Sequence, residues 1–138
     1  MNDANDKPLI LIVDDMTAVA SLTQETIEEL GYEAAVRQNA TTAIAFVGNH
    51  DVDLIMIDVD LADSLFSGIQ TAKLVQSKKD IPILFITAHD EIKTFREADF
   101  NSPIYVMLKP YDTRQLKMQI EVALYNREIA EKPPVIVF

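Results

Sequence analysis

The sequence predicts an α/β protein, with a parallel β-sheet that is covered by helices on both faces. Three observations support this fold class. Five short apolar runs alternate with segments of helical periodicity along the 138 residues. The runs have the length of buried strands, and four of them end in residues that can take part in chemistry. Regular alternation of this kind is typical of parallel sheets, because each crossover between parallel strands needs a long connection, usually a helix.

The first half of the chain supplies three of the expected strands. They cover residues 9–13, 33–37 and 53–57. The first and third strands are almost entirely apolar, as expected for strands that are buried on both faces. The second carries charged residues at both ends, which suits an edge position in the sheet.

Two helices are expected between these strands. The first covers residues 16–30 and ends at Gly31, and the second is expected to have Thr41 or Thr42 as its N-cap. In both helices the apolar residues recur at helical spacing. They are Val19, Leu22, Ile27 and Leu30 in the first helix and Ala43, Ile44, Phe46 and Val47 in the second.

The second half of the chain repeats the alternation. A loop at about residues 59–67 leads to a helix that begins with Gly68 and runs to about residue 77. Asp112 is the expected N-cap of the last helix. The later elements are a strand at 81–86 that ends at Thr87, a helix at 91–98, a strand at 104–108 and a last helix at 113–131.

Length and composition indicate one globular domain over residues 1–138, with a core at about 9–131 and short tails at 1–7 and 132–138. The net charge of −10 argues against unaided binding to nucleic acid or to an anionic membrane. The absence of cysteine excludes disulfides and thiolate metal sites. No apolar run is long enough to span a membrane and the acidic N-terminus does not resemble a signal peptide, so a cytoplasmic location is expected.

The residues that follow the expected strands are the strongest indication of function. An ionised carboxylate inside a buried sheet is costly, so Asp58, which closes an apolar run, is expected at the carboxyl edge of the sheet. In open α/β sheets this is the edge where ligands bind. The other side chains expected at this edge are Asp14 and Asp15 after the first strand, Thr87 after the fourth and Lys109 after the fifth.

This set of side chains suits the transfer of a phosphoryl group to a carboxylate. Neighbouring carboxylates raise each other's pKa values, and they stay ionised when a hard cation such as Mg²⁺ or Mn²⁺ shares the site. A lysine can pair with a carboxylate or with a phosphoryl oxygen, and a threonine hydroxyl can donate a hydrogen bond to the same group. The metal and the lysine together would neutralise the charge on the transferring oxygens.

Four motifs occur in order along the chain: Val13-Asp14-Asp15, Ile57-Asp58, Thr87-Ala88 and Lys109-Pro110. With these motifs the chain resembles the receiver domains of two-component response regulators, over about residues 9–131. The resemblance implies a flavodoxin-like (βα)5 fold, a doubly wound parallel sheet with strand order 2-1-3-4-5. It also implies a phosphoacceptor switch in phosphorelay signal transduction, and not an enzyme.

The same resemblance implies a role for each carboxylate. Asp58 is the expected phosphoacceptor, which takes its phosphoryl group from the phosphohistidine of a sensor histidine kinase or a histidine phosphotransfer domain. Asp15 and Asp58 are the expected direct ligands of Mg²⁺ or Mn²⁺. Asp14 would assist nearby, and the backbone carbonyl of Asp60 would be a further ligand.

Thr87 and Lys109 also have roles implied by the resemblance. Thr87 would move toward the aspartyl phosphate, Lys109 would contact a phosphoryl oxygen, and the peptide bond between Lys109 and Pro110 would be cis. A homodimer or partner contact is expected on the face formed by the helix at 91–98, the strand at 104–108 and the last helix. Phosphorylation is expected to strengthen that contact.

Four positions depart from the family pattern or can tune it. The aromatic switch residue usually stands three positions before the lysine, where this chain has Val106, with Tyr105 one position earlier. Because side chains alternate along a strand, either the strand is bulged and Tyr105 serves as the switch, or the aromatic coupling is absent. In similar domains the positions of Asp60 and His89 flank the path of the water that attacks the acyl phosphate, so the resemblance makes these two residues candidates for tuning its lifetime.

Two alternative functions follow from the same residues. Asp58-Val59-Asp60 resembles the Asp-x-Asp nucleophile motif of haloacid-dehalogenase-like phosphatases, which would make the protein a small phosphohydrolase, although that family places the motif after its first strand. The other alternative is a degenerate receiver that binds partners without phosphate, and the intact set of five side chains argues against it. The receiver itself could act alone or as a piece of a longer regulator.

Overall fold

The computed structural model describes residues 6–59, 64–88, 100 and 104–130. Five parallel strands form one sheet in the order β2-β1-β3-β4-β5, which confirms the predicted fold class and strand order. The helix predicted at residues 91–98 lies outside the described residues. The strands are β1 (Leu9–Val13), β2 (Glu33–Arg37), β3 (Leu54–Asp58), β4 (Ile83–Thr87) and β5 (Ile104–Leu108). The helices are α1 (Thr17–Glu29), α2 (Ala40–Asn49), α3 (Ser64–Gln76) and α5 (Thr113–Ala130).

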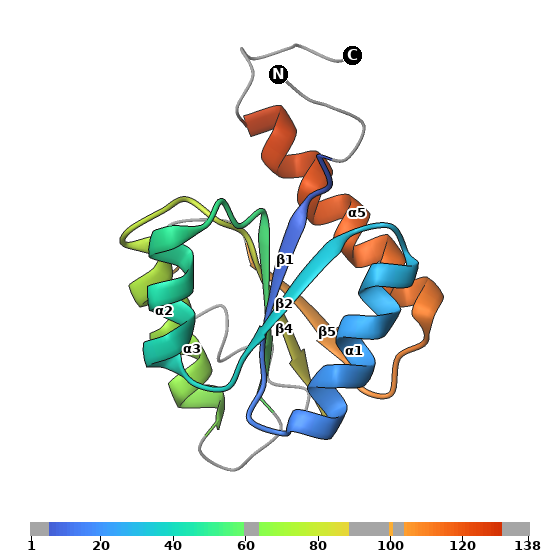
Figure 1. The fold of residues 1–138 in the computed structure, drawn as a ribbon, viewed down its shortest axis with the longest axis horizontal. Helices are drawn as coiled ribbons and strands as arrows, with labels where there is room; N and C mark the ends of the chain where they lie inside the picture. The colour runs from blue at the N-terminus through green and yellow to red at the C-terminus, as the bar shows by residue number, and fades with distance from the viewer. Residues whose placement is uncertain (1–5, 60–63, 89–99, 101–103, 131–138) are drawn as a thin grey trace.

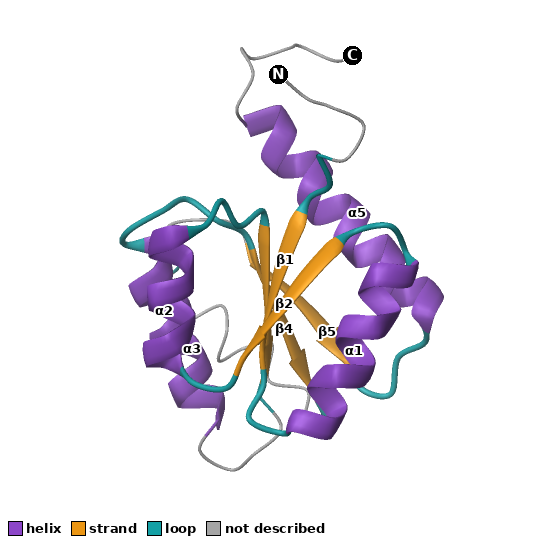
Figure 2. Ribbon diagram, in the orientation of Figure 1, coloured by secondary structure: helices purple, strands orange, loops and turns teal. Residues whose placement is uncertain are grey.

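Helices cover both faces of the sheet. Figure 1 shows α2 and α3 on one face and α1 and α5 on the other, and Figure 2 shows the strands enclosed between these two layers. Side chains alternate along each strand, so β1 turns Leu11 and Val13 toward α2 and α3, and Ile10 and Ile12 toward α1 and α5. Burial on both faces explains why the central strands are continuous apolar runs.

Helix α1 buries a narrower face than the sequence predicts. Ala20 and Ile27 are buried, but Leu22 is 67% exposed, so the prediction that Leu22 shares one apolar face of the helix with Ile27 is wrong. Leu22 follows Ala20 by two residues, which turns it about 200° around the helix axis. Gly31 follows the end of the helix with a φ of 101°, the left-handed conformation that glycine favours.

The N-caps of α2 and α5 depend on side chains just before each helix. Helix α2 begins one residue after Asn39, and the side-chain Oδ1 of Asn39 accepts a hydrogen bond from Thr42 N at 2.9 Å. Asn39 is therefore the N-cap of α2, and the prediction of Thr41 or Thr42 is wrong. Asp112 caps α5 as predicted, and its Oδ1 accepts from Gln115 N at 2.8 Å. Gln115 Oε1 accepts from Asp112 N in return, which completes a capping box.

Helix α3 begins at Ser64, so the prediction that Gly68 opens this helix is wrong. Gly68 lies inside the helix, where α3 packs closely on the end of β3. A Cβ at this position would lie 2.5 Å from Val59 Cγ1 and 3.2 Å from Ile57 Cγ2. Glycine stands here because the two elements leave no room for a side chain.

The strand ends shift slightly from the predicted boundaries. β3 takes in Asp58 and β4 takes in Thr87, so both residues are the last of their strands and not the first of the following loops. Both therefore have the fixed backbone of a paired strand while their side chains stand at its carboxyl end. No helix in the described parts of the chain is long and apolar enough to cross a membrane.

Candidate functional site

The register of β1 and β3 places two carboxylates side by side at the carboxyl edge of the sheet. The last pair between these strands is Val13 with Ile57, so Asp14 and Asp58 are the next residues along the two strands. The backbone N–H of Asp14 donates to Arg37 O at 3.1 Å, which extends the pairing with β2 by one residue. The strand geometry thus holds the backbone of Asp14 in place beside that of Asp58.

The register of β4 and β5 brings the next two predicted side chains to the same edge. Thr87 pairs with Leu108, and Lys109 N donates to Thr87 O at 2.8 Å. Thr87 is fully buried at the end of β4. The peptide bond between Lys109 and Pro110 is cis, as the family resemblance implies.

Asp58 and Lys109 form an ion pair across the edge of the sheet. The distance between Asp58 Oδ2 and Lys109 Nζ is 2.7 Å, and the side chains are only 15% and 27% exposed. The two residues come from β3 and from the end of β5, which are separated by β4. A charge-assisted hydrogen bond of this length keeps the ammonium group of the lysine in direct contact with the carboxylate.

Asp14 is the most deeply buried carboxylate of this edge. Burial raises its pKa above the ordinary value of 3.8, and the negative charges of Asp58 and Asp15 raise it further. The backbone N–H of Met16, which donates to Asp14 Oδ1 at 2.9 Å, and the charge of Lys109 act in the opposite direction. The ionised form of Asp14 is therefore costly unless a further positive charge joins the site.

The oxygen donors of this edge suit a Mg²⁺ ion. Among the described residues no three carboxylate or imidazole groups stand close enough together to hold a metal ion, so the predicted three carboxylates do not form a closed cluster. Mg²⁺ takes one or two carboxylates and keeps several waters, which fits Asp58 with an exposed Asp15 beside the buried Asp14. The remaining predicted ligand, Asp60, lies outside the described residues. His89, which was predicted to tune the lifetime of the acyl phosphate, also lies outside them.

The structure separates Tyr105 from the candidate site. The pairing of β4 with β5 is continuous from Ile104 to Leu108, so the strand is not bulged at this point. Tyr105 packs with the core on the α1 and α5 side, and Val106 packs with the core on the opposite side. The hydroxyl of Tyr105 accepts a hydrogen bond from Asn126 Nδ2 in α5 at 2.9 Å. This geometry favours the absence of the aromatic coupling.

Tyr111 is a residue of this edge that the sequence reasoning missed. The structure half-buries it against the core beneath α1 and α5. Burial raises the pKa of its hydroxyl above the ordinary value of 10.0, and the negative charges of Asp58 and Asp14 act in the same direction. Its position two residues after Lys109 was the only signal in the sequence that could have placed it here.

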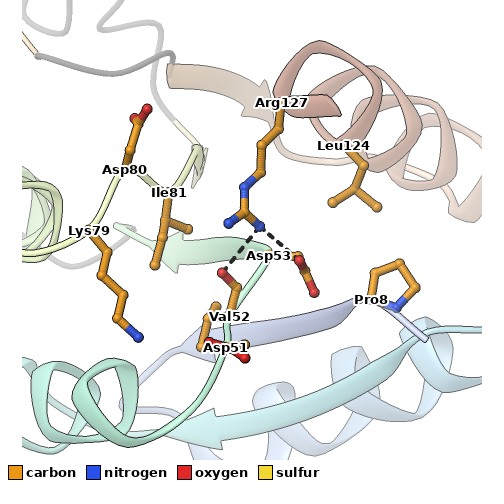
Figure 3. A pocket seen from close by; sticks show the side chains of 9 residues that line it. All are labelled: Pro8, Asp51, Val52, Asp53, Lys79, Asp80, Ile81, Leu124 and Arg127. Carbon is orange, nitrogen blue, oxygen red and sulfur yellow. Dashed lines mark hydrogen bonds and ion pairs between the residues drawn. The ribbon is translucent and has the colours of Figure 1, made fainter. Parts of the chain in front are cut away.

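A cavity of about 650 Å³ lies at the opposite, amino edge of the sheet. Figure 3 shows Arg127 reaching from α5 across this cavity to Val52 and Asp53. The ion pair between Arg127 Nη1 and Asp53 Oδ1 is 2.8 Å long, and Asp53 Oδ2 accepts a hydrogen bond from Leu9 N. These charged groups bind one another and the backbone, so the cavity is a less suitable reaction site than the carboxyl edge.

Comparison with known proteins identifies the family. Residues 10–121 match the family model described as the response regulator receiver domain. The heme response regulator HssR of Staphylococcus saprophyticus is 28% identical over 121 residues, which cover 86% of this chain and 53% of that protein. The transcriptional regulatory protein ZraR of Salmonella typhimurium is 32% identical over 127 residues, which cover 91% of this chain and 28% of that protein. The chain therefore spans about half the length of the first relative and less of the second.

Solved structures lead to the same family. The signal receiver domain of a modulated diguanylate cyclase from Desulfovibrio desulfuricans has a TM-score of 0.76 and 28% identity, covering 91% of this chain and 99% of that one. The chemotaxis protein CheY4 of Vibrio cholerae shares the fold, with a TM-score of 0.74 and 22% identity over 86% of this chain and 99% of that one. Since the family model spans most of the sequence, the chain belongs to the receiver domains of two-component response regulators.

Proposed function

We propose that Asp58 is the phosphoacceptor of this receiver domain. The observation that carries the proposal is the 2.7 Å ion pair between Asp58 Oδ2 and Lys109 Nζ at the carboxyl edge. A lysine held at this distance stabilises negative charge as it passes from the carboxylate to the phosphoryl oxygens. Receiver domains of this family are phosphorylated by histidine kinases. The donor is therefore a sensor histidine kinase or a histidine phosphotransfer domain, and the exchange takes place in the cytoplasm.

The transfer requires a nucleophile, a leaving group and compensation of charge. A carboxylate oxygen of Asp58 forms the new O–P bond while the P–N bond of the phosphohistidine breaks. The electron pair of the broken bond stays on the imidazole nitrogen, which takes up a proton. Lys109 offsets the charge on the phosphoryl oxygens, and Thr87 moves from its buried position at the end of β4 to donate a hydrogen bond to one of them.

Asp15 and Asp58 would hold a Mg²⁺ or Mn²⁺ ion directly. Asp14 would assist, and the backbone carbonyl of Asp60 would be a further ligand. Receiver domains of this family typically use Mg²⁺ for phosphorylation, and the cation would neutralise charge on the phosphoryl oxygens. The burial of Asp14 beside Asp58, which raises its pKa, supports the need for a further positive charge at this edge.

The outer surface of β5 and α5 supports a homodimer or partner contact. Met118, Val122 and Tyr125 are exposed at intervals of four and three residues along α5, and Leu108 of β5 is also exposed. Residues at these intervals lie on one side of a helix. Phosphorylation of Asp58 strengthens a contact through this surface. Sedimentation velocity with and without a phosphate mimic tests it, and unchanged mass together with unchanged partner binding would contradict it.

The phosphoacceptor is tested by intact mass after incubation with phosphoramidate and Mg²⁺. We expect the wild type to gain one phosphoryl group, and Asp58→Asn to gain none, because the amide nitrogen that replaces one oxygen removes the nucleophilic carboxylate. Asp53→Asn is the matched control, because it makes the same change of carboxylate to amide just before the amino end of β3. A metal-chelated sample of the wild type should also gain nothing.

Three results would contradict the proposal. They are uptake by Asp58→Asn, uptake that continues unchanged without metal, and no uptake by a folded wild type. The last result would favour a degenerate receiver that binds partners without phosphate. Multiple turnover of a phosphomonoester would instead favour the phosphohydrolase.

A further inference from the structure

Strand β2 forms one edge of the sheet. It comes first in the strand order, so it pairs with β1 on one side and, among the described residues, with no strand on the other. Helix α1 packs on one face of β2 and α2 packs on the other (Figure 1). An edge strand presents backbone groups on which a strand of another chain can pair. The groups along this free edge therefore decide whether a second chain can pair with β2.

The direction of each peptide group in β2 follows from its pairing with β1. At the two ends of the strand, Glu33 N and Arg37 O form hydrogen bonds of 3.0 and 3.1 Å with the backbone just before and just after β1. Neighbouring residues of a strand turn their N–H and C=O groups toward opposite sides of the strand. The N–H and C=O groups of Ala34 and Val36 therefore point away from β1, toward the free edge.

Side-chain donors cover both of the outward carbonyl groups. Gln24 Nε2, from the middle of α1, donates to Ala34 O at 3.0 Å. Arg37 Nη1 donates to Val36 O at 2.6 Å. A strand that paired with this edge would need the same two oxygens as acceptors. The two side chains therefore compete directly with an incoming strand.

Each of the two covering side chains is anchored to a helix beside the strand. Gln24 belongs to α1 itself. The guanidinium carbon of Arg37 lies 4.6 Å from the centre of the Phe46 ring in α2, a distance at which a cation is attracted to the face of a ring. Phe46 is buried and also stacks on His50, with 3.9 Å between the ring centres. The covers are thus held from both faces of the sheet.

The sequence of β2 is complementary to a second copy of itself. In an antiparallel pair centred on Ala35, Ala34 of one copy lies opposite Val36 of the other. Their outward peptide groups could exchange both N–H···O bonds of an antiparallel pair. The same register places Glu33 of one copy opposite Arg37 of the other, and opposite charges at facing positions stabilise a pair of strands. A second copy of this chain is therefore the partner that fits the edge.

We propose that the free edge of β2 is a pairing surface for a second copy of this chain, and that Gln24 and Arg37 keep it covered in the single chain. Pairing requires both side chains to leave the carbonyl groups. Arg37 would then turn from Val36 O to Glu33 of the second copy, whereas Gln24 has no role in the pair. β2 and β5 are the opposite edges of the sheet, so this surface is distinct from the contact proposed for β5 and α5.

The variant Gln24→Ala tests the proposal, because it uncovers Ala34 O and leaves Arg37 in place. Gln38→Ala is the matched control, since Gln38 Nε2 donates at 3.1 Å to Thr17 Oγ1 and not to an edge carbonyl. Sedimentation velocity over a series of protein concentrations, without a phosphodonor, measures the association. Amide hydrogen exchange of residues 33–37 locates it, and thermal unfolding verifies that each variant is folded.

We expect the association constant of Gln24→Ala to exceed that of the wild type by about thirtyfold, because a competing hydrogen bond is lost in each of the two copies. Gln38→Ala should associate as the wild type does. At concentrations that form the dimer of Gln24→Ala, the amide exchange of Ala34 and Val36 should slow by about tenfold, since both N–H groups enter the strand pair.

Two further substitutions in the Gln24→Ala protein test the strand register. Val36→Pro removes one outward N–H and leaves the bonds to β1 intact, because proline is tolerated where the N–H of an edge strand faces solvent. Glu33→Lys places like charges opposite each other in the pair. Both double variants should associate no more than the wild type. If Val36→Pro does not fold, Glu33→Lys decides the question.

A folded Gln24→Ala protein that associates no more than the wild type would overturn the inference. Association that persists in a folded double variant would also overturn it. A dimer of Gln24→Ala that leaves the amide exchange of residues 33–37 unchanged would have the same meaning, and would place the contact on another surface. None of these outcomes depends on phosphorylation, so the proposed phosphoacceptor is tested separately.

Discussion

Strand β3 has an ion pair at each of its ends, and the two ends are different kinds of site. At the carboxyl end, Asp58 Oδ2 lies 2.7 Å from Lys109 Nζ. Just before the amino end, Asp53 Oδ1 lies 2.8 Å from Arg127 Nη1. The two cations are almost equally exposed, at 27% and 26%. Neither the length of the pair nor the exposure of its cation therefore separates the two ends.

The neighbours of each carboxylate make the difference. The second oxygen of Asp53 accepts a backbone N–H at the start of β1, and Arg127 also donates to Val52 O, so this pair joins two strands to the end of α5. Asp58 instead lies near a buried Asp14, whose pKa it raises. One pair is completed by backbone partners and stabilises the fold, whereas the other is crowded by like charge and suits a reaction that adds a cation and a phosphoryl group.

The strongest test of this difference removes the cation at each end in turn. Lys109→Ala should slow phosphoryl uptake from phosphoramidate by about a hundredfold, because one stabilising cation is lost beside the developing charge. Arg127→Ala should leave the rate of uptake within about twofold and lower the free energy of unfolding by about 1–2 kcal/mol, through the lost hydrogen bonds and packing. Initial rates by intact mass and urea unfolding measure the two effects. Equal losses of uptake in both variants would contradict the division.

The packing around the carboxyl end of β3 should also tolerate an added side-chain atom less well than the packing elsewhere does. Gly68→Ala places a Cβ 2.5 Å from Val59 Cγ1 and 3.2 Å from Ile57 Cγ2, on the two residues that flank Asp58. Overpacking of this kind lowers the free energy of unfolding by about 1–3 kcal/mol. The displacement of Ile57 and Val59 should also shift Asp58 between them and slow phosphoryl uptake.

Gly48→Ala is the matched control for this substitution. Gly48 lies near the end of α2, and a Cβ there meets no atom within 4 Å. Alanine should stabilise the protein by up to about 1 kcal/mol, because it favours the helical conformation. Urea unfolding of both variants tests the pair, and destabilisation by both or by neither would show that the close approach at Gly68 does not matter.

These residues also show why the sequence predicts some features and not others. The strands, their order and the side chains at the carboxyl edge follow from local patterns. An apolar run that ends in Asp58 or Lys109 indicates both a strand and the residue at which the strand ends. The need for glycine at position 68 depends on the distance between α3 and β3, which no local pattern contains. The prediction for Leu22 in the first helix was wrong because a wide apolar stripe does not show which of its residues is exposed to solvent.

The packing of Tyr111 against the core on the α1 and α5 side was missed for a related reason. This packing brings a loop residue against residues of strands and helices that lie far from it in the sequence, and no local pattern indicates such a contact. The motif residues and the register of the sheet fix the backbone of the candidate site. The side-chain contacts that tune the site come from tertiary packing, and only the structure shows them.

The amino-end pair should make a moderate contribution to stability. Asp53→Ala removes the acceptor of both Leu9 N and Arg127 Nη1. The loss should lower the free energy of unfolding by about 1–2 kcal/mol, because a backbone N–H and a guanidinium lose their partner. Phosphoryl uptake should not change. High salt should reduce the difference from the wild type only in part, because salt screens the ion pair but not the backbone hydrogen bond. Complete loss of the difference in salt would contradict the role of the backbone bond.

The smallest expected effect has the opposite sign and belongs to the carboxyl end. Burial raises the pKa of Asp14 above 3.8 in the folded protein. Its favourable contribution to stability is therefore complete below pH 3.8 and is lost as the pH rises through the folded-state pKa. At pH 7 without Mg²⁺, Asp14→Asn should raise the free energy of unfolding by up to about 1 kcal/mol, within the usual range for single substitutions.

The pH dependence of this gain in stability distinguishes two explanations. Either Asp14→Asn removes an unfavourable buried charge, or the amide packs better than the carboxyl group. The gain should shrink as the pH falls through the raised folded-state pKa of Asp14, because the wild-type carboxyl group then takes up its proton. Added Mg²⁺ should also shrink it at pH 7, because the cation offsets the buried charge. Asp51→Asn, which removes an exposed carboxylate at the amino edge, should change the stability by less than about 0.5 kcal/mol at either pH. A gain for Asp14→Asn that is equal at pH 4 and pH 7 would contradict like-charge crowding at the carboxyl end of β3.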